Sequence, residues 1–187
     1  MAIKIYIDQG HNPRNPNAGA EGNGLREQDL VYDIGLMTAA RLRTRGIETR
    51  LSRPTASTQL GTSNASSLSA RVNEANSWGA DYFVSLHTNA AANKNASGSE
   101  AYVYRTVGKA ASLGRNILAQ LNLSTGLKNR GLFARPTLYV LKKTKMPAVL
   151  VELGFITNPS DAALMRDRPD LFAEGVANGI LAELGML

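Results

Sequence analysis

The sequence contains no cysteine, and this absence limits the chemistry open to the chain. Without thiols it can form neither disulfide bonds nor thiolate metal sites, so any metal must be held by imidazole, carboxylate or water. Aromatic residues are also few, at 6% of the chain, and they are scattered. Surfaces that bind nucleic acid typically cluster aromatic residues among arginines. We therefore expect no nucleic-acid partner.

Long apolar runs are absent as well. No segment approaches the roughly 20 apolar residues of a membrane-spanning helix, so we expect no membrane span. The first residues lack the basic region, apolar run and small-residue cleavage site of a signal peptide, and lead directly into a strand-like segment. We expect a protein that is made in the cytoplasm and released by lysis or another route, or a domain of a longer exported protein.

What is present is an ordinary globular composition with a basic balance. The chain has 187 residues, of which 43% are hydrophobic and 19% charged, and this suits one domain spanning residues 1–187. The net charge is +6, and a basic surface favours polyanions such as anionic lipid or an anionic cell-wall polymer. Lysine and arginine that serve only solubility are the alternative.

Apolar patterning predicts alternating strands and helices. We expect strands at residues 3–7, 47–51, 81–87, 100–104, 138–141 and 148–151. We expect helices at residues 27–45, 68–78, 107–123 and 169–184, and another that begins at Asn158 and Pro159. The segments 12–24, 54–67, 90–97 and 125–136 are expected to be loops. This order predicts a single α/β domain, with a central, mostly parallel sheet of about six strands and helices on both faces.

The residues that could carry chemistry follow predicted strands. His11 and His87, the two histidines of the chain, each end a strand-like run. In open α/β sheets the carboxyl ends of the strands form the edge at which ligands bind. Glu152 directly follows the apolar run at residues 149–151, where a buried carboxylate without a metal, a cation or a catalytic task would be costly. Glu27 begins the first predicted helix.

Two imidazoles and one carboxylate make the ligand set of a catalytic zinc site with one position open to water. Such a site lowers the pKa of the bound water to about 7, and a second carboxylate is then needed as general base and acid. Plainer interpretations stay open for each residue. His11 and His87 could be hydrogen-bonded histidines, and Glu27 could be a first-turn glutamate favoured by the helix dipole.

Four short motifs resemble one enzyme family. They are Asp-Gln-Gly-His at residues 8–11, Gly-Leu-Arg-Glu at 24–27, Ser-Leu-His-Thr-Asn at 85–89 and Val-Glu-Leu-Gly-Phe-Ile-Thr-Asn at 151–158. Their order and approximate spacing are similar to those of the zinc-dependent N-acetylmuramoyl-L-alanine amidases, the amidase-3 type of cell-wall hydrolase that includes autolysins and the catalytic domains of endolysins. The resemblance covers essentially the whole chain.

The resemblance implies a role for each motif residue. It implies that His11, Glu27 and His87 are the three ligands of Zn²⁺ and that Glu152 is the catalytic glutamate. The implied fold is a largely parallel sheet with helices on both sides. The implied substrate is the amide between the lactyl group of muramic acid and the first L-alanine of the peptide stem. One departure is Gln9, where the family more often has proline.

The resemblance also implies binding partners and leaves alternative functions open. Bacterial peptidoglycan is the implied partner, anionic wall polymers are candidates for the positive charge, and we expect a monomer. A zinc peptidase that cuts within the stem peptide is the nearest rival, and a catalytically inactive wall-binding module is another. The biological setting could be a phage lysin, a sporulation or autolytic enzyme, or the catalytic part of a longer protein.

Other polar residues near the motifs have two interpretations each. Glu21 competes as a ligand, but it lies in a Gly- and Asn-rich loop, whereas the helix-initial glutamate has a fixed geometry. Asp8 and Asn89 could orient an imidazole or form local turns. Glu100 could line the cleft or face solvent. Arg130 could meet the acidic groups of a stem peptide or be a solvated loop charge.

Overall fold

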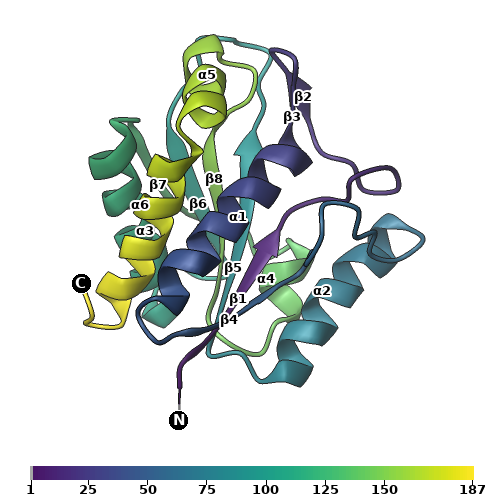
Figure 1. The fold of residues 1–187 in the computed structure, drawn as a ribbon, viewed down its shortest axis with the longest axis vertical. Helices are drawn as coiled ribbons and strands as arrows, with labels where there is room; N and C mark the ends of the chain where they lie inside the picture. The colour runs from purple at the N-terminus through teal and green to yellow at the C-terminus, as the bar shows by residue number, and fades with distance from the viewer. Residues whose placement is uncertain (1) are drawn as a thin grey trace.

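The computed structural model describes residues 2–187, in which six strands form one central sheet in the order β4-β1-β5-β8-β6-β7 (Figure 1). These strands are β1 (Lys4–Gln9), β4 (Glu48–Leu51), β5 (Tyr82–Asn89), β6 (Ser99–Val103), β7 (Asn129–Ala134) and β8 (Ala148–Phe155). Strands β4, β1, β5 and β8 are parallel to one another, whereas β6 pairs antiparallel with β8 and parallel with β7. The predicted mostly parallel sheet is confirmed. A separate two-stranded hairpin joins β2 (Glu21–Gly22) to β3 (Leu25–Arg26).

Six helices cover the two faces of the sheet (Figure 1). They are α1 (Glu27–Arg43), α2 (Asn64–Trp78), α3 (Gly108–Thr125), α4 (Tyr139–Lys143), α5 (Pro159–Asp167) and α6 (Pro169–Glu183). On one face, side chains of α1, α3 and α6 pack with Ile5 and Ile7 of β1 into the larger apolar cluster. On the other face, side chains of α2 and α4 pack with Tyr6, Phe83 and Leu150. None of the helices within residues 2–187 is long and apolar enough to cross a membrane.

The alternation of side chains along the strands decides where the polar motif residues point. Successive residues of a strand face opposite sides of the sheet. Phe83 and Leu150 face α2 and α4, so His87 and Glu152, separated from them by an even number of residues, face the same side. Helix α4 has only five residues. The carboxyl ends of β5 and β8 therefore present these two side chains beyond the edge of the helical layer.

Helix starts follow local capping chemistry. The Asn158 side chain accepts hydrogen bonds from Ser160 N and Asp161 N, with Pro159 in the first turn of α5, as predicted. Helix α2 begins at Asn64, one turn earlier than predicted, because Ser63 and Ser66 form a reciprocal capping box. The Ser- and Ala-rich composition of that turn made it resemble a loop.

Two predicted elements are wrong. The predicted strand at residues 138–141 belongs mainly to helix α4, in which Leu141 N and Lys142 N donate to Leu138 O. A short apolar run fits either state, and here Val140 and Leu141 pack on the α2 side of the sheet. The predicted loop at 125–136 contains β7. This strand lies at the sheet edge and buries little, so it lacks an alternating apolar pattern.

Candidate metal centre and active site

The two imidazoles meet at a single carboxylate oxygen. His11 Nε2 lies 3.2 Å and His87 Nδ1 lies 3.0 Å from Glu27 Oε1. The two rings are edge-on to each other, with centroids 4.8 Å apart. One candidate ligand atom from each of the three residues lies within 4.8 Å of the others. The structure thus brings together three side chains that are far apart in the sequence.

His11 is held in an unusual backbone conformation by a buried arginine. Its φ of 63° lies in the left-handed region that non-glycine residues seldom adopt. Arg71 of α2 is only 1% exposed, and it donates to Asp8 Oδ1 at 2.5 Å, to Gln9 O at 2.7 Å and to the carbonyl of His11. The other oxygen of Asp8 accepts from Ser85 Oγ of β5 at 2.7 Å. These bonds fix the end of β1 and tie it to β5 two residues before the second imidazole.

The buried Asp8–Arg71 pair leads to a stability prediction. Burial would raise the pKa of Asp8, but the Arg71 charge and the hydrogen bond from Ser85 outweigh it and lower the pKa below its usual 3.8. A pKa that is lower in the folded state stabilises the fold above pH 3.8, and this contribution is lost as the pH falls below that value. We expect Asp8→Asn to cost about 3–5 kcal/mol at pH 7, because it leaves Arg71 buried without its partner. The deficit relative to wild type should shrink toward pH 3.

Urea unfolding at pH 7 and pH 3, with chelator present to remove metal, measures this difference. Asp29→Asn serves as a control, because it removes an exposed ion pair with Arg26 and should change stability by less than about 1 kcal/mol. A deficit for Asp8→Asn that is equally large at both pH values would show that ionisation of Asp8 is not its source.

Glu27 is fixed by backbone donors as well as by its place at the start of α1. The residue is 3% exposed. Its Oε2 accepts from Ala20 N at 2.8 Å, and its Oε1 accepts from Thr88 N at 2.9 Å. Burial would raise the pKa of Glu27, but hydrogen bonds and charge from His11 and His87 outweigh it and hold the pKa well below its usual value. The carboxylate is therefore ionised, as a metal ligand requires.

A glycine permits the close approach of the first motif to the second imidazole. A Cβ on Gly10 would lie 2.5 Å from His87 Cε1 and 2.6 Å from the carbonyl oxygen of Leu86. Any side chain there would displace the imidazole or the strand. Gly10 N also donates to Leu86 O at 3.0 Å, so the turn after β1 is bonded directly to β5.

The three donors fit a zinc ion. Two nitrogens and one carboxylate oxygen are typical zinc ligands, and ligands about 2.0–2.1 Å from a tetrahedral ion lie about 3.3 Å apart. The nitrogen–oxygen separations of 3.0 and 3.2 Å agree with that spacing. The same oxygen accepts a hydrogen bond from Thr88 N, so its position between the two imidazole nitrogens is fixed.

Glu152 stands beside this centre without a partner for one of its oxygens. It pairs with His87 in the β5–β8 register. Its Oε2 is buried and makes no hydrogen bond to any of residues 2–187. Burial, followed by the charges of Glu27 and Glu100, raises the pKa of Glu152 to about 8. A nearby cation would lower this pKa again. The sequence-based argument that this carboxylate needs a cation or a catalytic task agrees with its missing partner.

The neighbouring carboxylate differs because it is fully bonded. Glu100 pairs with Glu152 in the β6–β8 register and is 8% exposed. It accepts from Asn89 Nδ2 and Arg130 Nε, both at 2.8 Å, and from the Tyr102 hydroxyl. Burial would raise the pKa of Glu100, but the bonds from Tyr102 and Arg130 outweigh it and lower the pKa. Glu100 is therefore a fixed anion, and Arg130 is occupied by it instead of standing free.

The remaining polar residues do not hold the imidazoles. Asp8 bonds to Arg71 and Ser85, and Asn89 bonds to Glu100 and to its own neighbour Ala90 N. Glu21 lies on the β2–β3 hairpin with its side chain 71% exposed, 3.8 Å from Arg26. Of the two competing carboxylates, only Glu27 joins the histidines.

Sequence reasoning did not single out Arg71 or Asp161 as supports of this site. Asp161, at the start of α5, is buried and accepts from Ser97 Oγ at 2.6 Å, from Gly98 N at 3.0 Å and from Phe155 N at 2.9 Å. It thereby joins the end of β8 to the loop after β5.

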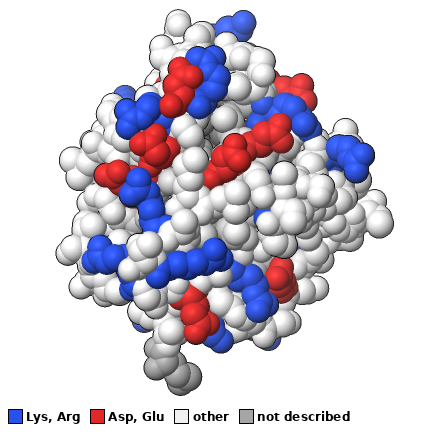
Figure 2. Space-filling view, viewed as in Figure 1, with Lys and Arg blue, Asp and Glu red and all other residues white. Residues whose placement is uncertain are grey.

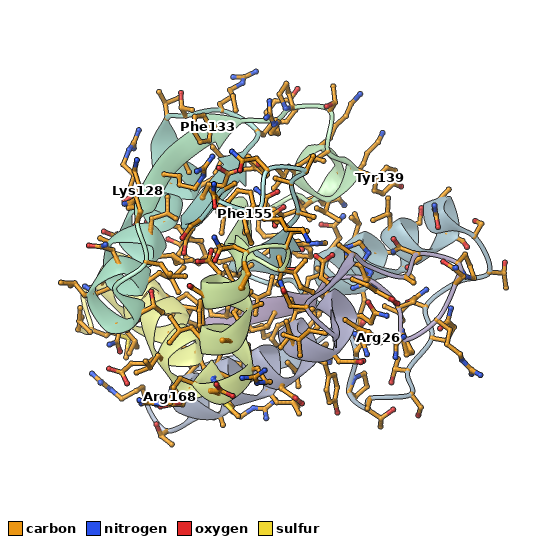
Figure 3. All side chains as sticks on the ribbon, turned by 90° about the horizontal axis from the view of Figure 1, so that it is seen from above. Arg26, Lys128, Phe133, Tyr139, Phe155 and Arg168 are labelled. Atoms are coloured by element: carbon orange, nitrogen blue, oxygen red, sulfur yellow. The ribbon has the colours of Figure 1, made fainter. Side chains whose placement is uncertain are left out.

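Seen from above, Phe133 and Tyr139 lie on the α4 side of the molecule, Arg168 lies on the α6 side, and Phe155 lies between them (Figure 3).

Two imidazoles at the carboxyl edge of an α/β sheet, the ionised carboxylate that begins α1 and a further carboxylate with one unpartnered oxygen are the residues of a catalytic zinc site in a hydrolase. A family model described as N-acetylmuramoyl-L-alanine amidase matches residues 5–182. The chain belongs to this family of zinc-dependent amidases, which confirms the predicted resemblance.

Individual relatives agree with the family assignment. The N-acetylmuramoyl-L-alanine amidase CwlM of Bacillus licheniformis is 36% identical over 187 residues, which span 95% of this chain and 67% of that protein. LytC of Bacillus subtilis is 37% identical over 183 residues, but the match spans only 35% of its length. The catalytic domain of CwlV from Bacillus (Paenibacillus) polymyxa var. colistinus has a TM-score of 0.86 at 27% identity, covering 99% of both chains.

Proposed function

We propose that the chain hydrolyses the amide between the lactyl group of muramic acid and the first L-alanine of the peptide stem. In this proposal His11, Glu27 and His87 hold zinc, and Glu152 moves the proton. As a member of its family the chain acts on peptidoglycan of the cell wall. The observation that supports the assignment of residues best is the convergence of three ligand atoms beside a buried carboxylate that lacks a partner.

The residues divide the work of hydrolysis between them. The zinc ion that His11, Glu27 and His87 would hold would supply a Lewis acid for the scissile carbonyl and a bound water with a pKa of about 7. Glu152 accepts the proton of the attacking water and passes it to the leaving alanine nitrogen. Burial raises its pKa toward neutrality, where one carboxyl group can both accept a proton and release it. Arg71, paired with Asp8, fixes the backbone at His11, and Ala20 and Thr88 hold the Glu27 carboxylate.

Digestion of purified peptidoglycan tests this function against both rivals. With the zinc-loaded chain, mass spectrometry should find glycan free of peptide and intact stems that begin with alanine. Chelator should abolish both products. Stems that are cut internally would identify a zinc peptidase instead. Binding to the wall without release of any amine would identify an inactive binding module.

We also propose that anionic wall polymers assist binding. The net charge of +6 supports this, and the face in Figure 2 shows a band of lysine and arginine across its lower part, with acidic side chains above and below it. On the face of the sheet that α2 and α4 cover, Lys142 and Lys143 of α4 are exposed. Residues 1–187 would act as one catalytic domain and as a monomer, which size-exclusion chromatography with light scattering tests.

The contribution of charge should depend on salt. Raising the salt concentration from about 50 mM to about 500 mM shortens the Debye length to a few ångströms, so binding to purified wall should weaken several-fold. Lys142→Glu combined with Lys143→Glu should weaken binding at low salt and show a smaller salt effect. Cleavage of a small soluble substrate serves as the control and should change little. Wall binding that is independent of salt would contradict the role of charge.

A further inference from the structure

A cavity of about 140 Å³ lies beside the two imidazoles on the side of the sheet that faces α2 and α4. His11 and His87 line it from the sheet edge. Leu68 of α2, Leu138 and Val140 at the start of α4, and Leu150 of β8 supply most of its other walls. The cavity thus joins an apolar space directly to the candidate metal centre.

Several polar groups around the cavity bond to one another, whereas His11 Nδ1 and Arg71 Nε make no hydrogen bond to any of residues 2–187. The Tyr139 hydroxyl lies 2.9 Å from Ser69 Oγ, and the Asp8 and Arg71 side chains form an ion pair at 2.5 Å. Three leucines and a valine dominate what remains. An apolar group of a ligand would therefore gain more from entering this cavity than a charged one.

The position of the cavity in the sheet indicates which half of the substrate enters it. Glu152 must reach the leaving nitrogen, so the alanine half of the substrate extends toward β8 and β6. The cavity is lined from β1, α2 and α4, and from β8 only by Leu150, so that neither Glu152 nor Glu100 lines it. The acyl half of the amide therefore lies on the cavity side of the metal centre.

We infer that this cavity is the subsite for the methyl group of the lactyl ether of muramic acid. The inference rests on the proposed function, because the lactyl carbonyl is the one that is attacked. Its methyl group is the apolar substituent next to that carbonyl on the acyl side. A cavity of about 150 Å³ admits benzene, so the space of about 140 Å³ accepts more than a methyl group. An ethyl group should fit as well.

Three soluble muramoyl tripeptides test the subsite. They differ only in the hydroxy acid that links the sugar to the peptide. The acid carries hydrogen (glycolyl), methyl (lactyl) or ethyl (2-hydroxybutanoyl) next to the scissile carbonyl. For the zinc-loaded wild type we expect kcat/KM for the lactyl substrate to exceed that for the glycolyl substrate about tenfold or more. The ethyl substrate should be cleaved at least as well as the lactyl one.

Variants that fill the cavity give the second readout. Leu68→Trp should reduce the lactyl-to-glycolyl ratio to near one and reject the ethyl substrate. Leu138→Phe fills the cavity from another wall and keeps the test decisive if Leu68→Trp does not fold. Leu184→Trp is the matched control, because Leu184 is also a partly buried leucine but packs against the cluster on the other face of the sheet. It should keep the wild-type ratio.

Equal kcat/KM for the lactyl and glycolyl substrates in the wild type would overturn the inference. A ratio that survives both filling variants would overturn it too. A fourth substrate, with glycine in place of alanine, tests the other half of the amide. If filling the cavity removed a preference for alanine over glycine and left the lactyl preference, the cavity would serve the leaving half. Failure to cut any of these substrates at the muramoyl–peptide bond would instead contradict the proposed function itself.

Discussion

Glu152→Gln should lose nearly all cleavage while zinc stays bound. Glutamine keeps the size of the side chain but cannot accept the proton of the attacking water. General acid–base catalysis of this kind contributes about 10²–10⁴-fold to the rate, so we expect a loss in kcat of that order. The side chain is not among the three candidate ligands, so metal content should match the wild type. Release of stem peptides with a free N-terminal alanine measures cleavage, and metal analysis of the same sample measures zinc content.

Stability separates this effect from misfolding. The Glu152 carboxylate is buried with one oxygen unpartnered, so its replacement by a neutral amide should leave the free energy of unfolding unchanged or raise it. Glu100→Gln is the matched control on the neighbouring strand. It weakens the bond to Arg130 but leaves Glu152 in place, so its loss of activity should be smaller. Wild-type cleavage by Glu152→Gln would show that another group moves the proton.

Glu27→Ala should lose both zinc and activity. Oε1 of Glu27 is the atom that both imidazoles approach, so the substitution removes the shared point of the candidate centre. Loss of a residue that merely orients a ligand typically weakens metal affinity 10–100-fold, and loss of a ligand itself should weaken it by more than about 100-fold. Competition with a chromophoric chelator measures the affinity directly.

Glu21→Ala provides the control for Glu27→Ala. Both substitutions remove a glutamate that precedes or begins α1, but Glu21 is largely exposed on the hairpin. Glu21→Ala should bind zinc and cleave peptidoglycan like the wild type. Tight zinc binding by Glu27→Ala, or weakened binding by Glu21→Ala, would show that the ligand set is assigned wrongly. Glu27→Ala also leaves Ala20 N and Thr88 N without their acceptor, so its binding is measured well below its melting temperature.

The parts of the molecule that the sequence predicts best are those with local signals. His11 and His87 follow strand-like runs, and parallel strands bring their carboxyl ends to one edge. Asn158 and Pro159 mark the start of α5 by their capping chemistry, whereas Glu27 begins α1 without a side-chain cap and is identified only by the family motif at residues 24–27. Each of these signals lies within a few residues of the group that it positions.

The parts that the sequence does not reveal depend on contacts between distant segments. Arg71 lies 60 residues from His11 in the chain, and in a helical pattern it resembles a solvated side chain. Its role follows only from the packing of α2 against the end of β1. Likewise, β7 is held as a strand by pairing with β6, and α4 is held as a helix by packing against Leu150. These contacts join distant segments, so neither element has a decisive local pattern.

Anomalous X-ray scattering at the zinc edge, from crystals of the zinc-loaded chain, tests the central claim most directly. We expect a peak within bonding distance of His11 Nε2, His87 Nδ1 and Glu27 Oε1, with the Glu152 carboxylate beside it. A peak at another place, or none between these three atoms, would show that these residues do not hold zinc.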